Sequence, residues 1–332
     1  MERYVDMASP LTGGKVKEIN TVETHEFRKE KYSVHVRYYI CEDTGERFTT
    51  TDQDTLLFND LYSQYRIRHG IPFPDEIQAV RERYSLTCSC ISKILGFGIN
   101  QYALYEKGQM PSESNGKMIS AIKDKAVMLS LLKDSKEEFP ENEYSRLYGL
   151  ISRADDAIAS CTDNIQLLYQ HTKRSIFNGF GQLDTGKLTE MVKFFVSRQK
   201  KTFPTKLNKE MFYADFYHYK LYGRSVSGLA YRAVMFGPVP DRYATIYDNI
   251  DSLEKETVLS HDMESTVLKC DTYNPAVFSA HEIETLEKVF NTVSPMSTSK
   301  IIEKSHQEDA WINYHTGNNL IPYSESFTLK LI

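Results

Sequence analysis

A chain of 332 residues exceeds the usual size of a single domain, so two or three domains are expected. Hydrophobic residues make up 41% of it and charged residues 26%, which suits a water-soluble protein with true hydrophobic cores. The net charge of −5 does not by itself predict a nucleic-acid partner, and five widely scattered cysteines argue against a disulfide framework.

The first 60 residues are expected to form a β-rich module. Residues 31–42 read KYSVHVRYYICE, an alternating run rich in Val and Tyr that predicts a half-buried strand, and EDTGERFTT adds a turn and a returning strand. The opening MERYVDMASPLTGG has neither the basic nor the apolar stretch of a signal peptide. The longest apolar runs, such as 127–132, are far too short to span a membrane. A cytoplasmic protein without membrane attachment is therefore expected.

From Asp52 the pattern becomes helical, until Pro72 and Pro74 end the helix. Three short helices are predicted next, in the stretches DEIQAVRERY (75–84), SCISKILGF and INQYALYEKG, with Gly96 and Gly108 as stops. This is the layout of a helix-turn-helix. The segment from Arg66 to Lys125 carries nine Lys or Arg and six Asp or Glu, so it is net positive within an acidic chain.

The third of these helices is expected to read DNA bases. Asn100 and Gln101 carry amides of the kind that pair with adenine, and Lys107 is expected to reach a phosphate. Ile99, Tyr102 and Tyr105 recur at threes, which predicts a buried stripe. Lys93, on the preceding helix, is a further candidate for DNA contact. The alternative is a plain three-helix packing unit whose two amides only face water.

Residues 126–178 predict two further helices, split by the acidic SKEEFPENE, and together act as a spacer. Residues 206–223 predict a central, largely buried helix that ends at Gly223, and its Asp215 and His218 need partners, either each other or nearby backbone. The stretch FGPVPDRY predicts a glycine-proline turn that opens a helix at Pro240. A helix start is also predicted at residues 279–282, where Ser and Glu form a capping box.

Enzyme patterns are weak throughout. The stretch GQLDTGK (181–187) has the skeleton of a phosphate-binding loop, but Leu188 follows where Ser or Thr is needed. The stretch GRSVSG misses the nucleophile-elbow spacing by one residue. His306 is expected to be a structural residue that fixes the helix carrying Trp311. The basic run 193–206 has three open interpretations: a nucleic-acid surface, a docking face for an acidic toxin, or a solvated helix end. No catalytic residue and no cofactor are expected.

Residues 74–112 resemble the DNA-binding half of MqsA-type (YgiT-type) antitoxins, which are relatives of Xre-type repressors. The specific part is ILGFGINQYALYEKG. The resemblance implies that Asn100 contacts bases. Leu104 occupies the position where that family often has an Arg, and a leucine there is suited to a thymine methyl.

The same family opens with a β-module that holds zinc through two CxxC pairs. The matching stretches here are SPLTGG (9–14) and YYICEDTGERF (38–48), in which the ligand positions are Ser9, Thr12, Cys41 and Thr44. One thiol of four cannot make a tetrahedral zinc site. The hairpin fold is therefore expected without a metal.

Residues 203–243 resemble the Panacea (SocA-like) domain of antitoxins and mobile-element proteins. The matching stretches are TKLNK, FYADFYHY, SVSGLAY and GPVPDRY, with SHQEDAW (305–311) as the closing motif. The resemblance implies a domain that neutralises a toxin by binding it, without catalysis. The residues that define the domain or meet the partner are then expected among Lys206, Asp215, His218, Tyr219, Gly228, Tyr231, Gly237, Pro238, His306 and Trp311.

The predicted fold class is α+β, mainly α, in four parts. These are a degenerate zinc-ribbon-like β module without metal (1–60), a helix-turn-helix domain (61–125), a helical spacer (126–180) and a mostly helical Panacea domain (181–332). We expect a homodimeric antitoxin that binds a toxin and represses its own operon by binding operator DNA. The alternatives are a repressor with no toxin partner and a protein-binding adaptor whose helix-turn-helix has lapsed.

Overall fold

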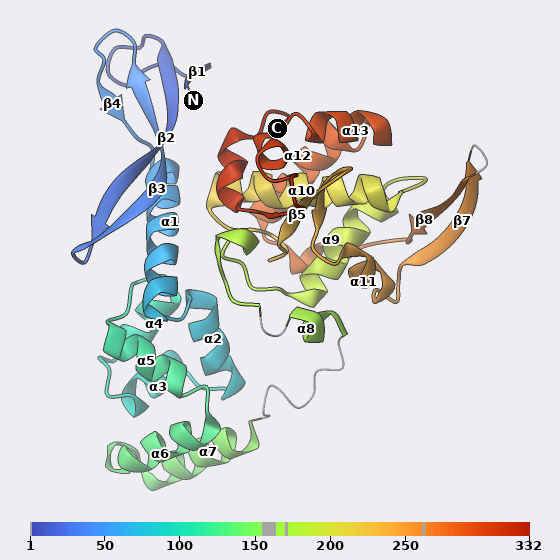
Figure 1. Cartoon of the computed structure of the whole chain (residues 1–332). Helices are drawn as coiled ribbons and strands as arrows, with labels where there is room; N and C mark the ends of the chain where they lie inside the picture. The colour runs from blue at the N-terminus through green and yellow to red at the C-terminus, as the bar shows by residue number, and fades with distance from the viewer. Residues whose placement is uncertain (1, 155–163, 170–171, 261–262) are drawn as a thin grey trace. The chain divides into compact units, whose positions relative to one another are not determined.

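A computed structural model describes residues 2–154, 164–169, 172–260 and 263–332 (Figure 1). The chain divides into two compact units, the first formed by Met1–Asp60 and Thr162–Ile332 and the second by Leu61–Cys161. The elements mix helix with antiparallel strand, as the predicted α+β class requires. Within the described ranges, no helix combines the length and the apolar character that crossing a membrane requires.

An antiparallel sheet of order β1-β2-β3-β4 opens the first unit. Its strands are β1 (Glu2–Val5), β2 (Val16–Phe27), β3 (Glu30–Cys41) and β4 (Arg47–Phe48). The strand predicted at residues 31–42 is confirmed as β3. The long β2–β3 pair closes through Arg28 and Lys29, both at positive φ (50° and 69°), as a two-residue hairpin turn requires. Tyr32, Val34 and Val36 alternate along β3 and are buried.

The N-terminal sheet is held to the C-terminal part of the same unit. The side-chain amide of Asn20 donates to the carbonyl of Phe327 at 3.1 Å, and Arg37 donates to the carbonyl of Lys220 at 3.1 Å. The ring of His35 stacks on Phe327 with centroids 4.3 Å apart. The sheet therefore folds with the C-terminal region rather than as a free-standing module.

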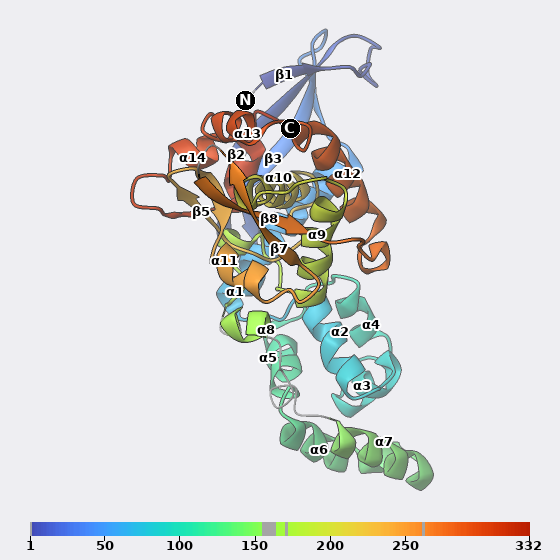
Figure 2. The ribbon, with the colours of Figure 1, turned by 90° about the vertical axis from the view of Figure 1, so that its right-hand side faces the viewer.

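The second unit is helical, and α1 (Thr51–His69) leads into it. Its other elements are α2 (Pro74–Arg83), α3 (Cys88–Ile94), α4 (Gln101–Glu106), α5 (Glu113–Ala121), α6 (Lys125–Asp134), η1 (Lys136–Glu138) and α7 (Glu141–Arg153). The sequence predicts that the α6–α7 hairpin is part of a spacer. Met128, Leu132, Leu147 and Ile151 are all fully buried in the core that α2–α5 also build, so α6 and α7 are part of this unit (Figures 1 and 2).

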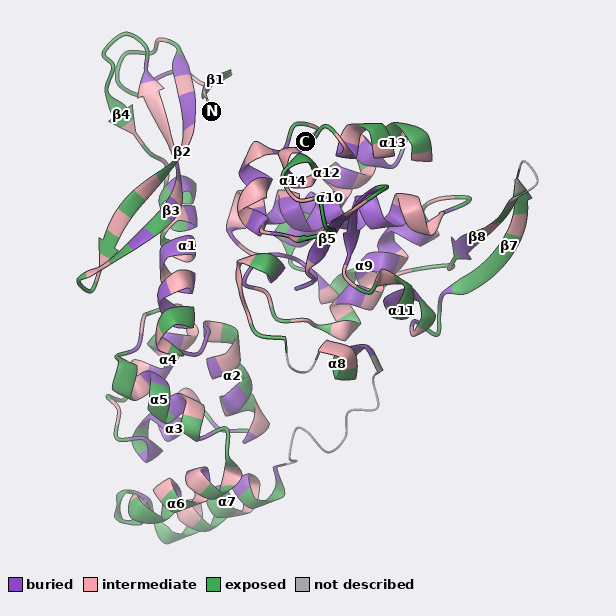
Figure 3. Ribbon diagram, in the orientation of Figure 1, coloured by how far each residue is buried: buried purple, intermediate pink, exposed green. Residues whose placement is uncertain are grey.

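The C-terminal part of the first unit surrounds one long helix. Its elements are α8 (Asn164–Tyr169), η2 (Ile176–Asn178), α9 (Thr185–Ser197), α10 (Pro204–Tyr222), β5 (Tyr231–Val234), β6 (Gly237–Pro240), α11 (Tyr243–Asp248), β7 (Glu254–Ser260), β8 (Met263–Lys269), η3 (Pro275–Val277), α12 (Ala280–Val293), α13 (Thr298–Ser305), α14 (Asp309–Ile312), β9 (Leu320–Ile321) and η4 (Tyr323–Thr328). Helix α10 is buried along most of its length (Figure 3), as predicted, and ends at Gly223 with φ 67°.

Two local predictions at the C-terminal end have different outcomes. The capping box is confirmed, because the backbone N–H of Glu282 donates to Ser279 Oγ and that of Ser279 donates to the Glu282 carboxylate. The helix predicted to open at Pro240 is wrong: residues 237–240 form strand β6, and α11 begins only at Tyr243. The prolines are tolerated because β6 is the edge strand of the sheet β6-β5-β9.

Candidate functional site

The first candidate surface is the start of α4 in the second unit. Asn100 is exposed at the position before the helix, and Gln101 is its first residue, half-buried, with its amide 3.0 Å from Gln109 Oε1. Tyr102 and Tyr105 are buried, as predicted. The prediction for Ile99 is wrong, because its side chain is 73% exposed. Ile99 precedes the helix, so the three-residue spacing that would turn it inward does not apply.

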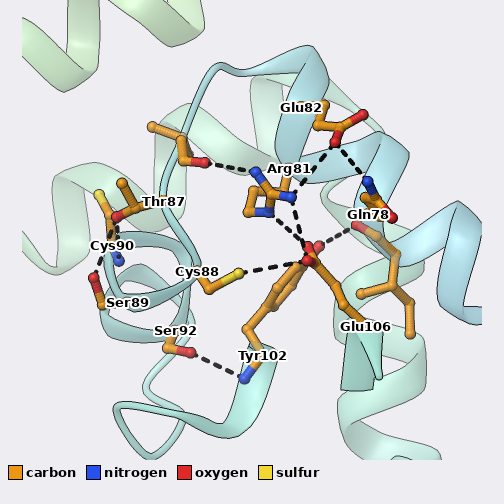
Figure 4. Close-up of polar contacts among 12 residues, drawn as sticks. Gln78, Arg81, Glu82, Thr87, Cys88, Ser89, Cys90, Ser92, Tyr102 and Glu106 are labelled. Atoms are coloured by element: carbon orange, nitrogen blue, oxygen red, sulfur yellow. Dashed lines mark hydrogen bonds and ion pairs between the residues drawn. The ribbon is translucent and has the colours of Figure 1, made fainter. Parts of the chain in front are cut away.

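Helix α4 is fixed to its neighbours by polar contacts (Figure 4). The backbone N–H of Tyr102 donates to Ser92 Oγ at 3.1 Å, and the Tyr102 hydroxyl donates to the carbonyl of Ile77 at 2.8 Å. Two guanidinium nitrogens of Arg81 donate to the two carboxylate oxygens of Glu106, at 2.6 and 3.2 Å. These contacts tie α4 to both α2 and α3, so the exposed start of α4 is presented rigidly.

Replacing Arg81 with methionine is expected to lower the free energy of unfolding of the second unit by about 2–3 kcal/mol. The side chain of Glu106 is only 14% exposed, so it would be left as a half-buried charge without its bidentate partner. Chemical unfolding followed by circular dichroism measures this. Arg153→Met, at an exposed site on α7, is the matched control and should change stability by less than about 0.5 kcal/mol. Equal stabilities of the two variants would contradict the assigned role of the pair.

The other predicted DNA contacts differ in how accessible their side chains are. Lys107 is exposed and Leu104 is 43% exposed, so both are available on the outer face of α4. Lys93 donates to the carbonyl of Glu138, and its ammonium lies 4.4 Å from the ring centre of Phe139. Lys93 therefore clasps η1 onto α3, and only its remaining N–H groups are available for another ligand.

The four ligand positions of the expected metal-free β module, Ser9, Thr12, Cys41 and Thr44, lie in two matching turns. Backbone N–H groups donate to the hydroxyls of Ser9, Thr12 and Thr44, at 3.2, 3.1 and 3.2 Å respectively. Thr12 Oγ1 lies 3.3 Å from Cys41 Sγ. Three of the four expected ligand positions thus carry hydroxyls that are bonded to the local backbone. Among the residues that the structure describes, no group of three or more His, Cys, Asp or Glu side chains is arranged to hold a metal.

Hydrogen bonds from these hydroxyls, that of Ser9 first, lower the pKa of the Cys41 thiol to about 6. Replacing Ser9 with alanine is expected to raise this pKa towards the ordinary value of about 8.5, because the thiolate loses its main donor. Titrating the ultraviolet absorbance of the thiolate measures the change. Cys41→Ala identifies the transition, since burial raises the pKa values of Cys88, Cys90 and Cys270, the other cysteines that the structure describes. A wild-type chain without a Cys41 transition below pH 8 would refute the expectation.

In the C-terminal part, Asp215 lies at the centre of a buried network. Its carboxylate accepts from the backbone N–H groups of Val226 and Ser227, both at 2.8 Å, from the hydroxyl of Ser227, and from the hydroxyl of Tyr231 at 2.6 Å. Burial raises the pKa of Asp215 and these donors oppose that rise. His218 Nδ1 lies 2.9 Å from Thr285 Oγ1, so Asp215 and His218 each have their own partners and do not pair with one another.

The sequence analysis does not predict the burial of three further charged residues, Lys209, Glu210 and Glu308. Lys209 donates to the carbonyl of Pro238 at 2.9 Å, and burial lowers its pKa to about 7. Glu210 accepts from the hydroxyl of Ser294 at 2.7 Å, and burial raises its pKa to about 7. Glu308 accepts from the backbone of the C-terminal segment, which it holds in place. For Lys209 and Glu210, the sequence signal that could have indicated burial is their position on α10, a helix whose apolar residues already predict a largely buried element.

Most of the residues expected to define the domain or to meet a partner make internal contacts. Those buried in the core are Asp215, His218, Tyr219, Gly228, Tyr231, Gly237 and Pro238. A Cβ at Gly228 would lie 2.7 Å from a backbone carbon of Gln182, and one at Gly237 would lie 2.4 Å from Ser305 Oγ. Both glycines thus allow close approach of neighbouring segments. Lys206 donates to the carbonyl of Ser294. Of the ten candidates, His306 and Trp311 are the two that lie beside a larger exposed apolar surface.

That surface is the Trp311 patch, defined by Met235, Phe236, Trp311 and Ile312. Exposed fractions are 76% for Met235, 59% for Phe236 and 46% for Ile312. The indole N–H of Trp311 donates to the carbonyl of Val234 at 2.8 Å, which joins α14 to the β5–β6 turn. Rings of His306 and His315 stack on Trp311, with centroid distances of 4.0 and 4.2 Å. The patch is rigid, aromatic and apolar, a composition typical of protein–protein hot spots.

Comparison with known proteins bears on this region. Residues 207–312 match the family described as Antitoxin SocA-like, Panacea domain. The match begins within α10 and ends in α14, so it includes Asp215, Gly228 and the whole Trp311 patch. No curated protein and no solved structure matches the chain.

Proposed function

We propose that this chain is an antitoxin that binds a protein toxin through residues 181–332 and neutralises it. The match of residues 207–312 to an antitoxin domain carries this proposal, because such a domain implies a protein partner. The Trp311 patch supports it, since large apolar side chains exposed together cost free energy in water unless a partner covers them.

Neutralisation by binding alone agrees with the chemistry of this region. The strongly perturbed groups Lys209, Glu210 and Asp215 are all buried and engaged in internal contacts. Asp184 caps α9, and Lys187 forms an ion pair with Glu282 at 2.8 Å, which argues against a phosphate-binding role for residues 181–187. We therefore propose no catalytic step.

Co-expression tests the toxin partnership. The open reading frame adjacent to this gene is expressed alone and together with this chain, and growth is followed. We expect growth arrest by the neighbour alone, rescue by this chain, and recovery of both proteins as one complex. A neighbour that is harmless and does not co-purify would refute the proposal.

The same proposal assigns operon repression to α2, α3 and α4 as a helix-turn-helix. The exposed amide of Asn100, the half-buried amide of Gln101 beside it and the net positive charge of Arg66–Lys125 support contact with operator DNA in the cytoplasm. One six-residue reading helix makes few contacts, so we propose that a homodimer binds two half-sites.

A gel shift on the gene's own promoter, at stated salt, tests base reading. Asn100→Ala is expected to weaken binding about tenfold or more, and Gln101→Ala to do the same, because each removes an amide from the reading position. Asn142→Ala, an exposed amide at the start of α7, is the matched control and should bind as the wild type does. Equal binding by all four proteins would refute base reading by this helix.

One observation favours the protein-binding adaptor as the second candidate. At the position where the MqsA-type family often has an Arg, Leu104 is 43% exposed and offers no charge to a phosphate. An adaptor would keep the toxin complex but would not shift the promoter fragment. A repressor without a toxin would give the opposite pair of results.

A further inference from the structure

A cavity of about 560 Å³ opens in the second unit, between α3 with the turn that follows it and the η1–α7 segment. Its volume is in the range of sites that take small molecules. All of its lining belongs to this unit, and Lys93 is the one lining residue that is also a predicted DNA contact.

The lining divides into an apolar wall and a polar wall. Leu86, Phe97, Phe139 and Leu147 supply the apolar wall, with two aromatic rings. Ser85, Thr87 and Ser89 supply hydroxyls around the start of α3. Thr87 and Ser89 lie on the side of α3 away from the Arg81–Glu106 pair (Figure 4). A ligand with an apolar, ring-sized body and one polar end matches this division.

The charged side chains that line the cavity determine which polar group a ligand should carry. Arg146 is exposed and forms no ion pair or hydrogen bond with the described residues, and Lys93 has N–H groups beyond the one given to Glu138. Together with the hydroxyls they present an excess of hydrogen-bond donors to an anion. Glu138 and Glu143 also line the cavity, and their carboxylates disfavour a ligand with a second negative charge.

The cavity is connected to the start of α4. Phe97 and Ile99 line it from a turn in which Gly96 and Gly98 alternate with them, and Gly96 has φ 66°. Ile99, at 73% exposure, is free to close over a ligand, and Asn100 follows it directly. Helix α4 is itself fixed to α2 and α3, so a movement of this turn would act on Asn100, which lies between the turn and the helix.

We propose that this cavity binds a small amphipathic monoanion, with a carboxylate or sulfonate beside Arg146 and an apolar body against Phe97 and Phe139. Binding orders the turn 96–99 and so changes DNA affinity. The regulatory half rests on the proposed DNA binding, whereas the binding site itself does not.

Two fluorescent probes test the site in the full chain. 1-Anilinonaphthalene-8-sulfonate has an aromatic body and one anion, and N-phenyl-1-naphthylamine is the same body without the charge. We expect saturable binding of the sulfonate. Ser89→Trp, which fills the cavity from an exposed position, should weaken both probes about tenfold or more, while Ser89→Ala should not.

Arg146→Ala should weaken the sulfonate about tenfold and the neutral probe less than twofold, because only the first has a charge to lose. Arg153→Ala on the same helix is the control. Unchanged sulfonate binding in Ser89→Trp would overturn the site, and equal loss of both probes in Arg146→Ala would overturn the anion assignment. If the probes behave as expected and the promoter shift is unaffected by saturating sulfonate, the coupling to DNA is wrong; absence of any shift instead refutes the DNA-binding proposal.

Discussion

Replacing Asp215 with alanine is expected to lower the free energy of unfolding of the first unit by about 4 kcal/mol. The carboxylate is fully buried and satisfies two backbone N–H groups, of Val226 and Ser227, and two hydroxyls, of Ser227 and Tyr231. Alanine would leave these four donors to find new acceptors in a closed interior, and each buried donor without one costs about 1–3 kcal/mol. A cavity of carboxylate size adds to the loss.

Fluorescence of Trp311 makes the measurement specific. It is the only tryptophan of the chain and lies in the first unit, so urea unfolding followed by its emission reports that unit. Asp251→Ala, at an exposed position of the same unit, is the control and should change stability by less than about 0.5 kcal/mol. Asp215→Asn, which keeps the volume but turns an NH₂ group towards existing donors, should lose nearly as much as alanine. A loss below about 1 kcal/mol in Asp215→Ala would contradict the proposed importance of the network.

Features with a local cause were predictable from the sequence. The capping box at Ser279 needs only residues three apart, and α10 ends at Gly223 because glycine readily adopts the left-handed conformation. Strand β3 was predictable because the alternation of apolar and polar residues is also a local pattern.

Features with a distant cause were not predictable from the pattern. Pro240 lies in a strand because β5 pairs with it, and its sequence alone reads as a turn before a helix. Asn20 bonds to Phe327 across 307 positions, so the attachment of the N-terminal sheet has no local signal. The sequence places Asp215 and Trp311 in one group of residues that define the domain or meet the partner. One is buried and one is partly exposed, and that difference depends on tertiary packing.

The exposed apolar groups beside Trp311 came from the structure alone. Met235 and Phe236 follow a strand and precede a glycine, which reads as an ordinary hairpin turn. Their exposure is informative only because Trp311 is bonded to the same turn and Ile312 continues the surface. A cluster of this kind, rather than the family-defining core, is where a partner has access.

Replacing Met235 and Phe236 together with alanine is expected to weaken the toxin complex about 100-fold or more and to abolish rescue in co-expression. Each side chain is more than half exposed, so truncation costs the free chain little stability but removes apolar area that binding would bury. Affinity between the purified proteins measures the effect, since a 100-fold loss corresponds to about 2.7 kcal/mol.

Leu259→Ala is the matched control for this pair. Leu259 is 78% exposed on β7, in the same unit but outside the Trp311 patch, so its truncation should leave both affinity and rescue unchanged. Unfolding curves reported by Trp311 must coincide for all three proteins, because the expected loss of affinity comes from lost contact area and not from a lost fold. Full rescue by the double variant, beside a wild type that rescues, would move the toxin to another face of the domain while leaving the antitoxin proposal standing. Loss of rescue by Leu259→Ala as well would instead indicate an interface that extends to the β7–β8 hairpin.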